Sequence, residues 1–395
     1  MASHGIRDKV AIVGMGCTHF GMHRDRSLGD LLIDASQAAM QSAGVKQKDV
    51  DAYWFGTFNS GVAGVTLSKP LKINYKPVTR TENYCATGSE AFRNACYAVA
   101  CGAYDVAMAI GGEKLSDPGM VGIPAVPPPS DGTTLDISAP GGFGLLSQGY
   151  GARYDVDMAE LRKAMTHIAW RNHKNGAGNP RAQFRSIVRK DTIDCAHPIA
   201  GNMSIFDCGA LGDGAAAAII VRAEDAHRYT SNPVYVKALS FAVGPGNGAL
   251  DRGYDFSHMP EVHISAVEAY RQAGVQVPRE EIAFAEVHDC FTITELVVME
   301  DLLFSERGQA WRDILNGEFD MEGRLPINPD GGLKAFGHPL GASGIRMMFE
   351  CWLQLRGEAG DRQLDHRGKL ALTQNLGGLP GELVGFTSIL GAQRG

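Results

Sequence analysis

Residues 84–103, YCATGSEAFRNACYAVACGA, are the strongest indication of the fold, because residues 338–358, HPLGASGIRMMFECWLQLRGE, repeat their outline. Both stretches open with small residues around a reactive side chain and continue with apolar residues at helical spacing. Other segments recur in the same order. A helix at 27–44 corresponds to one at 264–274, and a strand at 50–58 corresponds to one at 282–291. Two further strands, at 104–114 and 212–221, correspond to two strands within 368–390. A duplicated βαβαβ unit explains this order. The alternation predicts a mostly parallel sheet covered by helices, with two units packed back to back around one core.

The repeat divides the chain into three parts. The first half is predicted at residues 1–115 and 211–232, and the second half at 233–395. Residues 116–210 are rich in proline and glycine around one helical run near 161–173, which predicts an inserted loop domain that shapes a binding site.

Composition excludes several classes of function. The 395 residues are 44% hydrophobic and carry a formal net charge of −7, so no nucleic acid or anionic membrane partner is expected. No segment has the roughly 18 uninterrupted apolar residues of a membrane span, and the first residues do not form a secretion signal. Eight scattered cysteines lack the spacing of a disulfide framework or a zinc site. We therefore expect a soluble cytoplasmic protein with reduced thiols and no metal.

Cys85 is the first candidate for chemistry, because it stands where an irregular segment meets a predicted helix. The free amide groups and positive dipole end of a helix N-terminus favour a thiolate, and the small residues after Cys85 leave room for a substrate. This position suits a nucleophile with a pKa near neutral. The alternative is a small buried residue at a tight turn.

The second half supplies groups that a thiolate needs. His288 and Cys290 follow an apolar strand, and His338 precedes the helix that duplicates the one after Cys85. Ends of equivalent strands and helices can converge in a duplicated sheet, so these four side chains are predicted to meet.

Four motifs occur in order along nearly the whole chain: YCATGSEA (84–91), VHDCFTITEL (287–296), NPDGGLKAFGHPLGASG (328–344) and TQNLGG (373–378). Together they resemble the thiolase superfamily, specifically its sterol-carrier-protein-2-type branch. The resemblance implies a thiolase fold, in which the two halves form a five-layer α-β-α-β-α sandwich. It also implies a homodimer or a tetramer.

The resemblance implies a role for each site residue. Cys85 resembles the nucleophile that carries the acyl group, and His338 resembles the histidine that activates it. His288 resembles the residue that completes an oxyanion site for the enolate of acetyl-CoA. Cys290 resembles the cysteine that moves the proton, and Gly377 offers a backbone N–H to the other oxyanion.

One departure from the superfamily concerns the last motif. Many thiolases carry the proton-moving cysteine in a C-terminal CxGG turn, but here Asn375 stands at that position. In the sterol-carrier-type branch the cysteine of the HDCF motif takes over, and Cys290 is present.

These features predict a CoA-dependent thiolase that cleaves 3-oxoacyl-CoA, or condenses acyl-CoAs, with CoA as co-substrate and no permanent cofactor. The alternative is a thiolase-like acyltransferase subunit for unusual acyl or aromatic substrates, working with a small zinc-ribbon and OB-fold partner. A catalytically silent scaffold that binds acyl-CoA is the third hypothesis. Acyl-chain identity and reaction direction are not readable from the sequence.

The sequence contains two weaker patterns. The glycines at 14 and 16 resemble a dinucleotide fingerprint but lack its third glycine. The basic stretch at 170–190 could contact the phosphates of CoA, and its alternative is a solvated loop.

Overall fold

The computed structural model describes residues 5–117, 138–248, 251–366 and 368–395. Nine strands form one mixed sheet in the order β3-β2-β4-β7-β1-β8-β11-β10-β9. The strands of the first half are β1 (Val10–Cys17), β2 (Ala52–Gly56), β3 (Val78–Thr81), β4 (Val106–Glu113) and β7 (Gly214–Arg222). Those of the second half are β8 (Val234–Val243), β9 (Ile282–Glu286), β10 (Leu370–Leu379) and β11 (Glu382–Gly391).

The strand order shows the predicted duplication directly. If the strands of each half are numbered in chain order, the first half has the order third, second, fourth, fifth, first across the sheet. The second half lacks a third strand, and its remaining strands have the same order from the outer edge: second, fourth, fifth, first. Ile327 forms a parallel bridge with Ala285 of β9, at the place of the missing third strand. The halves join through β1 and β8, where Ala11 pairs with Tyr235 and Ile12 with Val234.

The prediction of a mostly parallel sheet was wrong. Among the strands in the described residues, only β2–β3, β2–β4 and β9–β10 pair in parallel, while the other five pairings of the large sheet are antiparallel. The reason lies in the connections, because consecutive strands that pair in parallel need a crossover connection, usually a helix, whereas antiparallel strands do not. Residues 380–381 form a two-residue hairpin turn between β10 and β11, and β7 returns after a long excursion rather than after one crossover helix.

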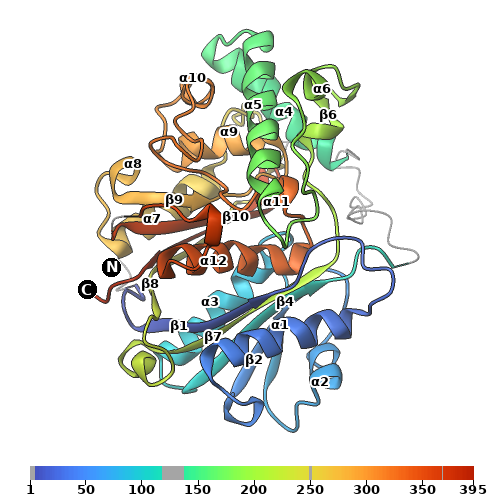
Figure 1. Cartoon of the computed structure of the whole chain (residues 1–395). Helices are drawn as coiled ribbons and strands as arrows, with labels where there is room; N and C mark the ends of the chain where they lie inside the picture. The colour runs from blue at the N-terminus through green and yellow to red at the C-terminus, as the bar shows by residue number, and fades with distance from the viewer. Residues whose placement is uncertain (1–4, 118–137, 249–250, 367) are drawn as a thin grey trace.

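Two helices lie between the halves and complete the predicted five layers (Figure 1). Helices α3 (Thr87–Ala100) and α12 (Leu340–Arg356) pack against each other, α3 on β4 and α12 on both halves of the sheet. Helix α1 (Leu28–Ala43) covers the outer face of the first half, and α7 (Pro260–Ala273) covers that of the second. The predicted arrangement of two α/β halves with helices between them and on both outer faces is confirmed.

Glycines let the two central helices approach at backbone distance. A Cβ built on Gly88 of α3 would lie 2.6 Å from the carbonyl oxygen of Gly341 in α12. The first turns of α3 and α12 are therefore held side by side, and so are the residues that precede each helix.

Local signals set the ends of α1 as expected. The Ser27 hydroxyl accepts a hydrogen bond from the Asp30 N–H, and Gly44 ends the helix with a left-handed φ of 64°.

The segment between β4 and β7 stands above the sheet (Figure 1). It contains α4 (Ala139–Tyr154), α5 (Met158–Ala177), α6 (Lys190–Asp194), β5 (Pro198–Ala200) and β6 (Met203–Ser204). The glycine-rich residues 138–144, which fall within the predicted loop domain, form the N-cap and the first turns of α4, because Ser138 caps the helix and Pro140 fits its first turn. The proline-rich residues 118–137 lie outside the described part, and the exact domain boundaries stay a prediction.

Shorter helices complete the second half and the N-terminal edge. They are α2 (Val65–Leu71), α8 (Pro278–Glu281), α9 (Thr292–Asp301), α10 (Ala310–Leu315) and α11 (Gly332–Ala335). Among the described residues, no helix is both long enough and apolar enough to cross a membrane.

Candidate active site

Cys85 lies immediately before α3, as the sequence predicted, in a backbone held by several constraints. The preceding Tyr84 has a φ of 52°, a left-handed conformation that is uncommon outside glycine. The Thr87 side chain accepts a hydrogen bond from the Asn83 N–H at 2.8 Å and closes this turn. Burial leaves the Cys85 side chain only partly accessible.

Gly377 lies directly against the backbone of Cys85. A Cβ at this glycine would fall 2.8 Å from the Cys85 amide nitrogen and 2.7 Å from the carbonyl oxygen of Asn83. Only a glycine allows β10 to approach so closely. The two predicted oxyanion donors therefore come from neighbouring backbone segments.

His338 precedes α12 at the matching place in the second half. Its backbone N–H donates to the Ala210 carbonyl at 2.6 Å, and its ring Nδ1 lies 2.7 Å from the Ser343 hydroxyl. That hydroxyl donates to the Pro339 carbonyl at 3.1 Å, so it accepts from the ring. The proton of neutral His338 is thus assigned to Nδ1, and Nε2 keeps a free lone pair.

His288 follows β9 and carries its proton on the other nitrogen. Its Nδ1 lies 2.8 Å from the side-chain nitrogen of Asn375 and 3.5 Å from the backbone N of Leu376. Both groups donate, so Nδ1 accepts and Nε2 bears the hydrogen.

The structure brings Cys85 and both histidines together. The Cys85 sulfur and one ring nitrogen from each of His288 and His338 all lie within 4.8 Å of one another. The two imidazoles meet edge to face, with ring centres 5.3 Å apart, and each Nε2 is buried without a hydrogen-bond partner among the described residues. A cysteine and two histidines are also a ligand set that suits zinc, although metal binding was not expected from the sequence.

Cys290 belongs to the same site. Its side chain is 8% exposed, and its sulfur lies 3.8 Å from the Thr294 hydroxyl. Burial raises the pKa of the Cys290 thiol, and electrostatic interaction with Cys85 raises it further. The Gly209 N–H donates to the Cys290 carbonyl at 2.7 Å and anchors this loop.

Burial sets the protonation states of these four side chains. The prediction that the pKa of Cys85 lies near neutral is wrong. Desolvation raises the pKa of Cys85 to about 12, with smaller contributions from Glu113 and Glu82. Desolvation also raises the pKa of Cys290 well above its ordinary value. It lowers the pKa of His288 well below its ordinary value and lowers the pKa of His338 to about 3. The resting site holds two thiols and two neutral imidazoles.

Two buried carboxylates hold the motif loops together, and the sequence analysis missed both. Asp289 accepts hydrogen bonds from the backbone N–H of Leu333 at 2.6 Å and of Lys334 at 3.1 Å, which joins the loop of His288 to the loop before His338. Glu113, at the end of β4, accepts from the Gly341 N–H at 3.0 Å and fixes the start of α12. A carboxylate that ends a buried strand was the available signal for Glu113.

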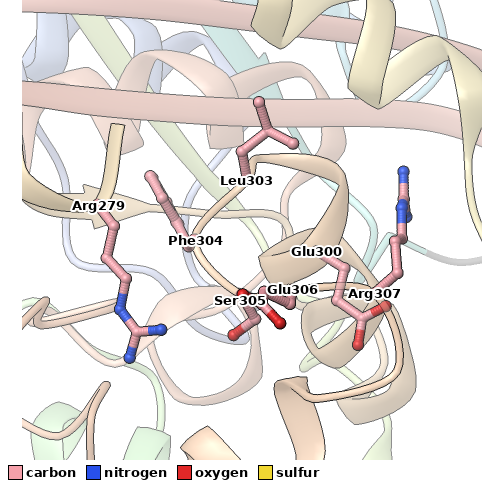
Figure 2. A pocket seen from close by; sticks show the side chains of 7 residues that line it. All are labelled: Arg279, Glu300, Leu303, Phe304, Ser305, Glu306 and Arg307. Carbon is pink, nitrogen blue, oxygen red and sulfur yellow. The ribbon is translucent and has the colours of Figure 1, made fainter. Parts of the chain in front are cut away.

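Two cavities are lined by residues other than these four. The first, of about 370 Å³, lies at the far end of α9, about 15 Å along the helix from Cys290. It lies between Arg279 and Arg307 (Figure 2). The second, of about 480 Å³, is lined in part by the basic stretch at 170–190, including Arg185, and by Lys334. Phosphate contact by this stretch stays a prediction.

Comparison with known proteins gives consistent matches over most of the chain. The family model described as Thiolase, N-terminal domain matches residues 10–224, and Thiolase C-terminal domain-like matches residues 247–391. The acetyl-CoA acetyltransferase of Methanothermobacter thermautotrophicus is 34% identical over 381 residues, covering 94% of this chain and 97% of that protein. Sterol carrier protein 2 of Homo sapiens is 31% identical over 397 residues, covering 93% of this chain and 70% of that protein.

Solved structures share the fold at lower sequence identity. The Ltp2-ChsH2(DUF35) aldolase aligns with a TM-score of 0.82 at 22% identity, covering 99% of both chains. Human mitochondrial 3-ketoacyl-CoA thiolase aligns with a TM-score of 0.71 at 18% identity, covering 98% of this chain and 99% of that one.

A duplicated α/β fold with a cysteine before one central helix and a histidine before its counterpart is typical of thiolases, which are CoA-dependent acyltransferases. This chain belongs to the thiolase family. The resemblance to its sterol-carrier-protein-2-type branch and the predicted class of enzyme are both confirmed.

Proposed function

We propose that Cys85 carries the acyl group and that His338, His288 and Cys290 move the protons and hold the charge in this thiolase. The observation that supports this most strongly is the arrangement of the two neutral imidazoles. At Cys85, one ring has a free lone pair on Nε2 and the other has an N–H. A base and a hydrogen-bond donor thus face one sulfur.

The cleavage direction starts with proton transfer from the Cys85 thiol to Nε2 of His338. The sulfur attacks the 3-keto carbon, and the alkoxide accepts hydrogen bonds from the backbone N–H groups of Cys85 and Gly377. When the carbonyl re-forms, the C2–C3 bond breaks and leaves an acyl thioester on Cys85. The electron pair moves into the enolate of acetyl-CoA, whose oxygen accepts the Nε2–H of His288.

Cys290 completes the cycle. Its thiol protonates the enolate carbon, and acetyl-CoA leaves. The resulting Cys290 thiolate takes the proton from the thiol of a fresh CoA, whose sulfur attacks the acyl thioester. Acyl-CoA departs, and Cys85 recovers its proton from His338. The same steps in reverse give a condensation of two acyl-CoAs.

The test is a panel of 3-oxoacyl-CoAs with free CoA, followed by loss of the substrate enolate absorbance. We expect wild-type turnover on part of the panel, and a loss of at least about 10²-fold in Cys85→Ala and Cys290→Ala. Equal rates in the wild type and both variants on every substrate would refute the assignment.

A second candidate is an acyltransferase for unusual acyl or aromatic substrates that works with a small zinc-ribbon and OB-fold partner. The structural neighbour named Ltp2-ChsH2(DUF35) aldolase joins two proteins by name, which supports testing this alternative. Co-purification of a small zinc protein, together with activity that requires it, would favour the partner-dependent enzyme.

We also propose a homodimer or tetramer that assembles through the edge strand β3. The segment before this strand exposes Tyr75 fully, and Val62 is 91% exposed. A cytoplasmic location is consistent with the eight unpaired cysteines. Light scattering of the purified chain tests the oligomeric state, and a monomeric mass would exclude it.

A further inference from the structure

Asn375 occupies the position where many thiolases carry a second cysteine, and its side chain is completely buried between the two halves. Its oxygen Oδ1 lies 2.9 Å from the hydroxyl of Ser89, which belongs to α3. Its nitrogen Nδ2 lies 2.8 Å from Nδ1 of His288. One amide therefore connects the helix of the nucleophile to the imidazole of the other half.

A backbone group fixes the direction of these hydrogen bonds. The N–H of Leu376 faces Nδ1 of His288 at 3.5 Å, and a backbone N–H can only donate. Nδ1 must therefore accept, so Asn375 turns its Nδ2 to the ring and its Oδ1 to the Ser89 hydroxyl. The hydrogen of the neutral ring is consequently held on Nε2, which is buried and has no hydrogen-bond partner among the described residues.

Cys85, His288 and His338 have the composition of a metal site. The Cys85 sulfur and the two ring nitrogens lie within 4.8 Å of one another in a buried space, and zinc favours thiolate and imidazole ligands. A ring nitrogen binds a metal only through a free lone pair. His338 has one on Nε2, but His288 does not while its Nδ1 accepts two hydrogen bonds.

We propose that Asn375 fixes the tautomer of His288, so that this histidine donates a hydrogen bond to a substrate oxygen and cannot join Cys85 and His338 in binding a divalent metal. Asn375 is a positioning residue, because it acts through His288. The statement about the substrate oxygen rests on the proposed function, whereas the statements about the tautomer and the metal do not.

Asn375→Asp reverses the arrangement with almost no change in shape. A carboxylate accepts the Nδ1 hydrogen, which leaves Nε2 free to bind metal, as in carboxylate–histidine–zinc sites. Gln374→Glu is the matched control. It adds the same charge one residue away, and the oxygen at that position accepts from the backbone N–H of His288 rather than from its ring.

The metal experiment titrates each full-length protein with Co²⁺ and follows the absorption bands of cobalt–thiolate coordination. We expect Asn375→Asp to bind Co²⁺ about 10- to 100-fold more tightly than the wild type and Gln374→Glu, the range by which groups behind a metal ligand change affinity. The cobalt–thiolate bands should disappear in Asn375→Asp combined with Cys85→Ala. Binding by Asn375→Asp no tighter than by the wild type or by Gln374→Glu would overturn the proposal.

An independent measurement uses the wild type alone. Nitrogen-15 NMR of labelled histidines distinguishes the tautomers, with a His288→Asn variant to assign the signal. We expect His288 to carry its proton on Nε2, and a proton on Nδ1 would overturn the proposal.

Activity separates this proposal from the proposed function. Asn375→Asp should lower kcat by about 10²- to 10³-fold with little change in KM, because the lost donor acts in the transition state. If the wild type is an active thiolase and Asn375→Asp has the same kcat, the proposal that Asn375 makes His288 donate to a substrate oxygen is overturned. If the wild type has no thiolase activity while the NMR and cobalt results hold, the proposed function fails and the tautomer assignment stands.

Discussion

Replacing His338 by glutamine should make the protein less sensitive to acid. His338 is 2% exposed, and desolvation lowers its pKa to about 3 in the folded protein from an ordinary value of 6.5. As the pH falls below 6.5, the unfolded chain binds a proton at this residue while the folded chain does not. The unfolded state is therefore favoured progressively between pH 6.5 and pH 3.

The size of the effect follows from the two pKa values. At pH 4.5 the unfolded histidine is protonated about a hundredfold over its neutral form, and the folded one stays neutral. Linkage converts this difference into about 3 kcal/mol of lost stability relative to pH 7.5, at about 1.4 kcal/mol per pKa unit. His173 and His288 are shifted in the same direction, so only the difference between the wild type and the variant isolates His338.

Urea denaturation at half-unit steps from pH 7.5 to pH 4.5 measures the effect. The free energy of unfolding of the wild type should fall by about 3 kcal/mol more than that of His338→Gln over this range. His197→Gln removes an exposed histidine from the excursion and controls for the loss of one imidazole. Parallel curves for the wild type and His338→Gln would refute the conclusion that His338 is buried in its neutral form.

Three further predictions concern helix packing and a buried ion cluster. Gly341→Ala would place a Cβ 2.6 Å from the Gly56 carbonyl oxygen, so we expect a loss of about 1–3 kcal/mol in urea denaturation. A Cβ on Gly144 would lie no closer than 3.5 Å to any neighbouring atom, so Gly144→Ala should stabilise α4 by up to about 1 kcal/mol. Equal denaturation midpoints for Gly341→Ala and Gly144→Ala would contradict these two expectations. Arg346→Met leaves the carboxylates of Glu286 and Asp330 buried without their shared cation, which should cost about 3–5 kcal/mol. Adding Glu286→Gln and Asp330→Asn should recover most of that stability, and an unchanged denaturation midpoint for Arg346→Met alone would contradict the ion cluster.

The sequence predicted those parts of the fold that local chemistry determines. Ser27 and Gly44 mark the ends of α1 because capping and left-handed φ depend on neighbouring residues. The duplication was visible because both halves carry the same order of patterns. Strand direction was missed, since a strand has the same apolar pattern in parallel and in antiparallel pairing.

The site was predictable in composition and not in electrostatics. Motifs located Cys85, His288, Cys290 and His338, but the pKa of Cys85 depends on how completely the halves enclose it. Asn375 stood out in the sequence only as a missing cysteine. Its contact with Ser89 spans 286 positions of the chain, and such a contact follows from tertiary packing alone.

The most direct test of the central claim is the intact mass of the protein after brief mixing with a 3-oxoacyl-CoA in the absence of free CoA. We expect a mass increase of one acyl group, located on Cys85 by peptide mapping and released when CoA is added, with no increase in Cys85→Ala. An acyl group on another residue, or turnover by Cys85→Ala at the wild-type rate, would contradict it.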